Sequence, residues 1–93
     1  MDVSQFDEKI RPLLDDYFLE RTWFADGDFG SLDRIELEGC NKLATIDFWS
    51  EGWISIDVYD CLDEEQVMNV LLSPDKVDLV PDEFKKLLAV LVP

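Results

Sequence analysis

A change in hydrophobic period constrains this chain more than any other feature. Between residues 33 and 59 apolar side chains recur at every second position, which is typical of strands with one buried face. Ile35 and Leu37 alternate with charged residues, and two further runs repeat the pattern with β-branched and aromatic residues. The pattern predicts strands over about 33–38, 43–49 and 53–59.

Two turns fix the register of these strands. Ser50-Glu51-Gly52 is typical of a three-residue hairpin loop, because glycine readily adopts the left-handed conformation that such a loop needs. Cys40-Asn41 is expected to form a tight turn. Both turns independently place the aliphatic residues on one face, which predicts a three-stranded antiparallel meander. The predicted pairs are Gly39–Lys42, Leu37–Ala44, Ile35–Ile46, Glu36–Thr45 and Arg34–Asp47, then Trp49–Trp53, Phe48–Ile54, Asp47–Ser55, Ile46–Ile56, Thr45–Asp57 and Ala44–Val58.

Helical spacing precedes the strands. Residues 4–20 repeat apolar side chains three and four positions apart, and Ser4 is a candidate N-cap. Pro12 interrupts this pattern, so the helix is expected to kink there or to begin there. Residues 25–31 are expected to form a polar loop.

Two further helices are expected after the strands. Asp63 and Gln66 have the spacing of a capping box, which predicts a helix through 67–72, although so short an apolar run could also be a strand. Pro81-Asp82 opens a last helix. The sequence therefore predicts one α+β domain over 1–93, with an N-terminal helix and two C-terminal helices packed on one face of the meander.

The charge of the chain limits its partners. It has 22 acidic and 8 basic residues, a formal net charge of −14. Bare nucleic acid and anionic membranes would repel it, so a basic protein partner is expected, and repulsion between copies predicts a monomer. Because there is no histidine, His-based acid–base catalysis and ordinary zinc sites are not expected. We expect no enzymatic activity, no metal and no cofactor.

The remaining sequence signals are weaker. The loop that begins at Asp26 lacks the glutamate that completes a calcium-binding loop, so it is interpreted as a polar loop. Cys40 and Cys61 lack the spacing of a redox or metal motif and are interpreted as reduced thiols. An acidic N-terminus without a signal-peptide pattern favours a cytoplasmic location.

The second face of the meander is the most informative candidate site. It combines aromatic side chains with carboxylates, which is typical of a protein interface, although the tryptophans could instead cover the sheet while the acids are merely solvated. The acidic loops at 26–28 and 60–65 form a secondary candidate surface. The candidate partner-binding residues are Glu36, Asp47, Trp49, Glu51, Trp53, Asp57 and Tyr59, and the secondary ones are Asp26, Asp28, Asp60, Asp63 and Glu64.

One stretch also suggests a family. The string DFWSEGWISIDVYD over 47–60, followed by NVLLSP over 69–74, resembles small immunity proteins of bacterial polymorphic toxin systems, including contact-dependent growth inhibition and nuclease bacteriocins. The resemblance implies a cytoplasmic inhibitor that binds a cognate toxin, often a nuclease, and occludes its active site. The alternatives are a DNA-mimic inhibitor or antitoxin of a DNA-binding protein, and an acidic adaptor without an inhibitory role.

Overall fold

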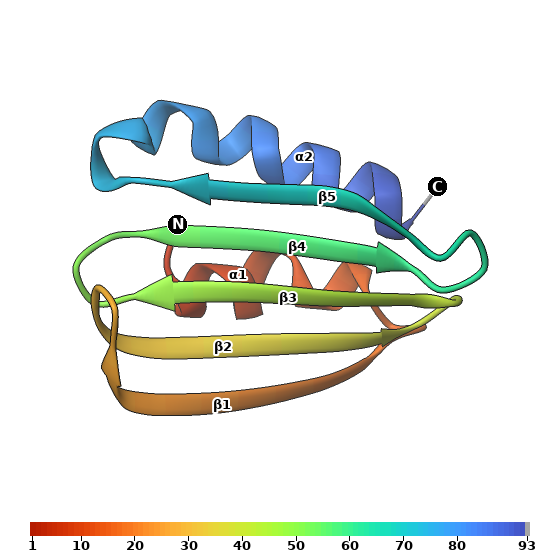
Figure 1. Cartoon of the computed structure of the whole chain (residues 1–93), viewed down its shortest axis with the longest axis horizontal. Helices are drawn as coiled ribbons and strands as arrows, with labels where there is room; N and C mark the ends of the chain where they lie inside the picture. The colour runs from red at the N-terminus through yellow and green to blue at the C-terminus, as the bar shows by residue number, and fades with distance from the viewer. Residues whose placement is uncertain (93) are drawn as a thin grey trace.

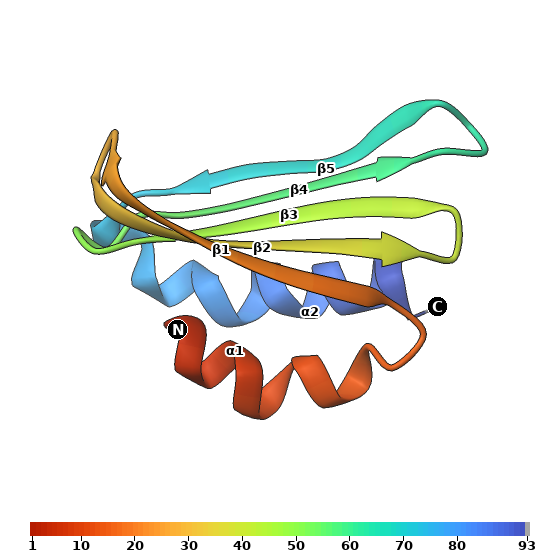
Figure 2. The ribbon, with the colours of Figure 1, turned by 90° about the horizontal axis from the view of Figure 1, so that it is seen from below.

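A computed structural model describes residues 1–92 as two layers, a five-stranded antiparallel sheet and a layer of helices (Figures 1 and 2). The strands follow one another across the sheet in the order β1-β2-β3-β4-β5. Both helices cover the same face, as Figure 2 shows. The elements are α1 (Val3–Lys9), a 3₁₀ turn η1 (Arg11–Leu13), β1 (Phe18–Gly27), β2 (Gly30–Gly39), β3 (Lys42–Trp49), β4 (Ile54–Asp60), β5 (Glu65–Leu72), a 3₁₀ segment η2 (Pro74–Leu79) and α2 (Val80–Leu91).

The predicted three-stranded meander with two C-terminal helices is wrong, because the sheet has two more strands. The segment predicted as a helix from Asp63 is a turn followed by β5. The Asp60 carboxylate accepts the backbone N–H groups of Leu62 and Asp63, at 2.9 and 3.2 Å, so the chain turns there. The segment then pairs with β4 as an antiparallel strand, and its Met68 and Leu72 side chains are buried. Of the two alternatives for 67–72, the strand is correct.

The N-terminal helix is also shorter than predicted. Its N-cap is Asp2 rather than Ser4, because Asp2 accepts the backbone N–H of Gln5 and Gln5 accepts that of Asp2, at 2.9 and 3.1 Å. The helix ends at Lys9, and Pro12 lies in η1. Residues 18–27 then form an edge strand, in place of a helix end and a loop.

The predicted register of the central hairpins is confirmed at every pair expected between β2, β3 and β4. The turns have the expected backbone, since Gly52 has φ +96° and Cys40 and Asn41 have φ 49° and 61°. The Trp49 N–H donates to the Trp53 carbonyl at 3.0 Å, which closes the hairpin between β3 and β4. The two turns therefore carried enough information to align three strands.

The hydrophobic core lies between the sheet and the helices. Phe6 of α1 packs edge-on against Phe48 of β3 and Phe84 of α2, with ring centroids 6.1 and 6.3 Å apart. The buried Tyr17 hydroxyl donates to the carbonyl of Leu91 at 2.6 Å, and burial raises the pKa of Tyr17 to about 12.

None of the helices described over residues 1–92 has the length and apolarity that crossing a membrane requires.

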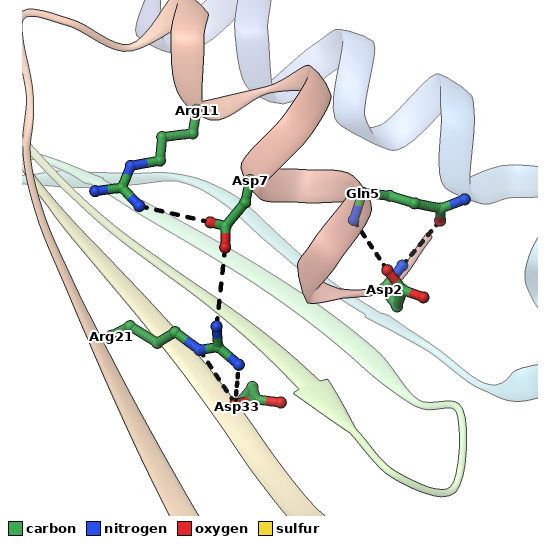
Figure 3. A network of polar contacts seen from close by, with 6 residues as sticks. All are labelled: Asp2, Gln5, Asp7, Arg11, Arg21 and Asp33. Atoms are coloured by element: carbon green, nitrogen blue, oxygen red, sulfur yellow. Dashed lines mark hydrogen bonds and ion pairs between the residues drawn. The ribbon is translucent and has the colours of Figure 1, made fainter.

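Ion pairs on the helix side of the sheet occupy two of the arginines. Figure 3 shows Asp7 of α1 between Arg11 and Arg21, with nitrogen–oxygen distances of 3.9 and 3.8 Å. Arg21 also contacts Asp33 across β1 and β2 at 2.9 Å. Exposed pairs of this kind stabilise a fold by only about 0–1 kcal/mol. Their consequence is that these positive charges lie on the helix side, away from the other face of the sheet.

Candidate functional site: the outer face of the sheet

The face of the sheet that points away from α1 and α2 is left uncovered by the described residues (Figure 2). Because successive side chains of a strand point to opposite faces, the register identifies the residues that share this face. We call it the outer face. It carries Phe18, Glu20, Thr22 and Phe24 of β1, Leu32, Arg34, Glu36 and Glu38 of β2, Leu43, Thr45, Asp47 and Trp49 of β3, Ser55, Asp57 and Tyr59 of β4, and Asn69 and Leu71 of β5.

Four exposed carboxylates gather on the outer face, and we call Glu20, Glu36, Glu38 and Asp57 the acidic patch. Glu20 lies directly opposite Glu36 on the neighbouring strand. Like charges in this position destabilise a sheet, so the fold carries a repulsion that a bound cation would relieve. The Gln66 amide donates to the Asp57 carboxylate at 2.6 Å, which leaves the charge of that carboxylate uncompensated.

Arg34 is the cation of the outer face, and Asp47 holds it. The Nε and Nη2 groups of Arg34 donate to the two carboxylate oxygens of Asp47 at 2.9 and 3.2 Å. The Ser55 hydroxyl donates to the same carboxylate at 3.4 Å. The hydrogen bond to Asp47 raises the pKa of Arg34 further above its usual range. Arg34 also lies over the ring of Phe24, 5.5 Å from its centroid. The buried Asp47 is therefore engaged within the fold. Arg34 also interacts electrostatically with Glu36, but its hydrogen bonds go to Asp47 and not to the acidic patch.

Exposed apolar side chains border the acidic patch. Phe18 is 71% exposed and Leu43 is 46% exposed, and Tyr59 is also exposed on the outer face. A hollow of about 220 Å³ lies between Phe18, Leu43 and the glutamates of β1 and β2. Carboxylates beside exposed aromatic and aliphatic groups suit a partner surface that carries both cations and apolar contacts.

The two candidate tryptophans lie at one end of the sheet, inside an aromatic cluster. Phe29, from the turn between β1 and β2, stacks on Trp53 at 4.0 Å and meets Trp49 edge-on at 5.3 Å. The backbone of Glu51 donates to the Phe29 carbonyl at 3.2 Å, which joins this turn to the one between β3 and β4. Both tryptophans are half-buried as a result. Their structural role is to hold the turn between β1 and β2 against the turn between β3 and β4.

The sequence-predicted site residues thus fall in three places. Glu36, Asp57 and Tyr59 lie exposed on the outer face, together with the engaged Asp47. A second group lies in or beside the joined turns at one end of the sheet: Trp49, which ends β3, Asp26 near the end of β1, and Asp28, Glu51 and Trp53. The third group lies at the other end, where Asp60 ends β4 and Asp63 and Glu64 follow in the turn to β5.

Sequence reasoning missed Phe18, Glu20 and Leu43 as candidate contacts of the outer face. Apolar and polar residues do not alternate over 18–24, so the signal for β1 is limited to the strand propensity of Thr22, Trp23 and Phe24. Phe18 also fits the helical pattern of residues 4–20, which hides the start of the strand.

Trp53→Ala is expected to lower the free energy of unfolding by about 2 kcal/mol, because it removes a stacked aromatic pair and a half-buried side chain. Trp23→Ala is a matched control, because Trp23 is 61% exposed and is expected to cost less than about 0.5 kcal/mol. Urea unfolding of both variants measures the difference. Wild-type stability of Trp53→Ala together with a large loss of partner affinity would instead identify Trp53 as a binding anchor.

No group of three or more potential metal ligands occurs among residues 1–92. Cys40 and Cys61 are both free and exposed.

No protein-family model, no curated protein and no solved structure matches the chain.

Proposed function

We propose that this chain is an inhibitory binding protein of the immunity type, which captures a basic toxin domain with the outer face of its sheet. The observation that carries the proposal is the acidic patch on a sheet face that neither helix covers. The cation of that face is already paired with Asp47. A basic partner would gain favourable charge contacts there and would relieve the repulsion between Glu20 and Glu36.

A nuclease domain is the class of toxin that fits this surface best. A nuclease must hold phosphates, so its active site presents lysine and arginine side chains. Carboxylates compete for the same groups through charge-assisted hydrogen bonds. Close charge pairs in such interfaces couple by about 1.5–7 kcal/mol, so a few of the exposed glutamates could dominate the binding energy.

Apolar contacts supply the second part of the proposed interface. Phe18 and Leu43 flank the glutamates of β1 and β2, and large exposed side chains of this kind act as anchors when a partner excludes water from them. The proposal therefore assigns steering to the acidic patch and anchoring to Phe18 and Leu43. Tyr59 offers both an apolar ring and a hydroxyl.

Capture from the native host tests this function directly. Immobilised wild-type protein and a Glu36→Lys variant are used in parallel, and proteins retained only by the wild type are identified and purified. The proposal predicts a basic protein that hydrolyses tRNA or DNA and loses that activity when one equivalent of this chain is added. A DNA-binding regulator without nuclease activity would favour the DNA-mimic alternative, and a retained acidic or neutral protein would contradict the proposal.

A further inference from the structure

The sheet has two open edges, β1 and β5, and they differ in how they resist further pairing. β1 carries Glu20, Arg21 and Asp26, and its register shifts between Phe24 and Gly27. Charged side chains and irregularities of this kind are how proteins discourage strand addition at an edge. β5 has one register shift as well, where Val67 is extra between the pairs Tyr59–Gln66 and Val58–Met68. From Met68 onward its pairing is regular, and residues 66 to 74 carry no charge in a chain of net charge −14.

The hydrogen-bond pattern shows which backbone groups of β5 point outward. The Trp49 N–H donates to the Trp53 carbonyl, and hydrogen-bonded pairs alternate with non-bonded pairs along antiparallel strands. The backbone groups of odd-numbered β4 residues therefore bond to β3, and those of even-numbered β4 residues bond to β5. The hydrogen-bonded pairs between β4 and β5 are then Ile54–Leu72, Ile56–Val70 and Val58–Met68. The N–H and C=O groups of Asn69 and Leu71 consequently point away from the sheet.

The side chains and flanks of this edge indicate what could pair with it. Val67 and Leu71 are 41% and 54% exposed. Both flanks of the uncharged run are net negative: residues 63–65 before it are all acidic, and Asp75 and Asp78 after it outnumber Lys76. The complementary strand has apolar residues at its centre and lysine or arginine at its ends.

A second copy of this chain fits the edge poorly. Its own acids would meet those at the ends of β5. Figure 1 also shows α2 displaced past β5 toward the open side, and Figure 2 shows it one layer below the sheet. Two copies paired through β5 would bring both α2 helices to the same place. A strand with no helix beneath it avoids this clash.

We propose that the β5 edge receives an extended segment of a partner protein as an additional strand, with an apolar centre and basic ends. Main-chain hydrogen bonds to Asn69 and Leu71 supply affinity, while Val67, Leu71 and the flanking acids select the sequence. The proposal concerns a different surface from the acidic patch and does not rest on the proposed function.

The test uses a displayed library of random nine-residue peptides, selected on the whole protein. Asn69→Pro is the key variant, because proline removes one outward N–H and is tolerated at outward-facing positions of an edge strand. Asn69→Ala is the matched control, since it retains that N–H. Selection on wild type and on Asn69→Ala is expected to enrich alternating apolar peptides with basic ends, and the best peptide is expected to bind Asn69→Pro at least about tenfold more weakly. Amide exchange at Asn69 and Leu71 is expected to slow when that peptide binds wild type.

A second variant keeps the proposal falsifiable if Asn69→Pro fails to fold. Leu71→Lys leaves the backbone intact and is expected to reduce binding of basic peptides by about tenfold through charge repulsion. Peptides that bind both variants as tightly as wild type, or that lose affinity with Glu36→Lys instead, would overturn the proposal. So would a concentration-dependent dimer that Asn69→Pro abolishes, because the second copy would then be the occupant. Failure of this test leaves the outer-face result unchanged, since Glu36 and Asn69 are varied separately.

Discussion

Glu36→Lys is expected to weaken capture of the basic partner by about 100-fold while slightly stabilising the folded protein. The reversed charge would meet lysine or arginine of the partner, and a 100-fold change corresponds to about 2.8 kcal/mol, within the range of measured charge couplings. In the folded protein, Glu20 would lie opposite the ammonium group of the new lysine and no longer opposite a second carboxylate. This opposite-charge pair is expected to stabilise the fold by about 0.2–1 kcal/mol. Titration calorimetry and urea unfolding of the same protein measure the two effects.

Glu8→Lys is the matched control for this experiment. It makes the same change in net charge at an exposed position of α1, on the opposite side of the sheet. At physiological salt, charges separated by more than about 8 Å are largely screened, so the affinity is expected to change by less than about threefold. Equal weakening by Glu8→Lys and Glu36→Lys would mean that the partner responds to total charge rather than to the outer face.

Asp47→Ala is expected to lower the free energy of unfolding by about 2 kcal/mol. The substitution removes the carboxylate that accepts two hydrogen bonds of Arg34, and hydrogen bonds to charged groups contribute about 1.5–3 kcal/mol. The larger cost of a buried unpaired charge does not apply, because the Arg34 side chain is 37% exposed and water can solvate it. Urea unfolding at neutral pH measures the change.

Asp57→Ala and Asp47→Asn complete that comparison. Asp57 is an exposed neighbour on the same face, and its truncation is expected to cost less than about 0.5 kcal/mol. Asp47→Asn retains an acceptor for Arg34 without the charge, so an intermediate loss is expected. If Asp47→Ala were as stable as Asp57→Ala but bound the partner poorly, Asp47 would be a contact residue rather than a structural one.

The central hairpins were predictable because two kinds of local evidence agree there. Turn chemistry at Gly52 and at Cys40-Asn41 sets the register, and the alternation of Ile46 and Ile56 with polar neighbours sets the buried face. Helix-like patterns hid both outer strands, although Asp26-Gly27 and Gly30 mark a turn before β2. β5 follows a turn stabilised by Asp60, and the capping-box spacing of Asp63 and Gln66 imitated a helix start.

The candidate site was predictable to the same extent as the strands beneath it. Glu36 and Asp57 could be assigned to the outer face because the register of β2, β3 and β4 could be derived. Phe18 and Glu20 could not, since their strand was read as the end of a helix. The stacking of Phe29 on Trp53 depends on two turns meeting in space, which no local pattern in the sequence specifies.

Carboxyl footprinting of the complex tests the central claim most directly. A water-soluble carbodiimide couples an amine to accessible carboxylates, and mass spectrometry compares labelling of the free protein with labelling of the protein bound to its captured partner. The account predicts that labelling of Glu20, Glu36, Glu38 and Asp57 falls several-fold in the complex. Labelling of Glu8, Asp15 and Asp82, which are exposed outside the outer face, is expected to stay unchanged. Protection of these three with full labelling of the acidic patch would contradict the account.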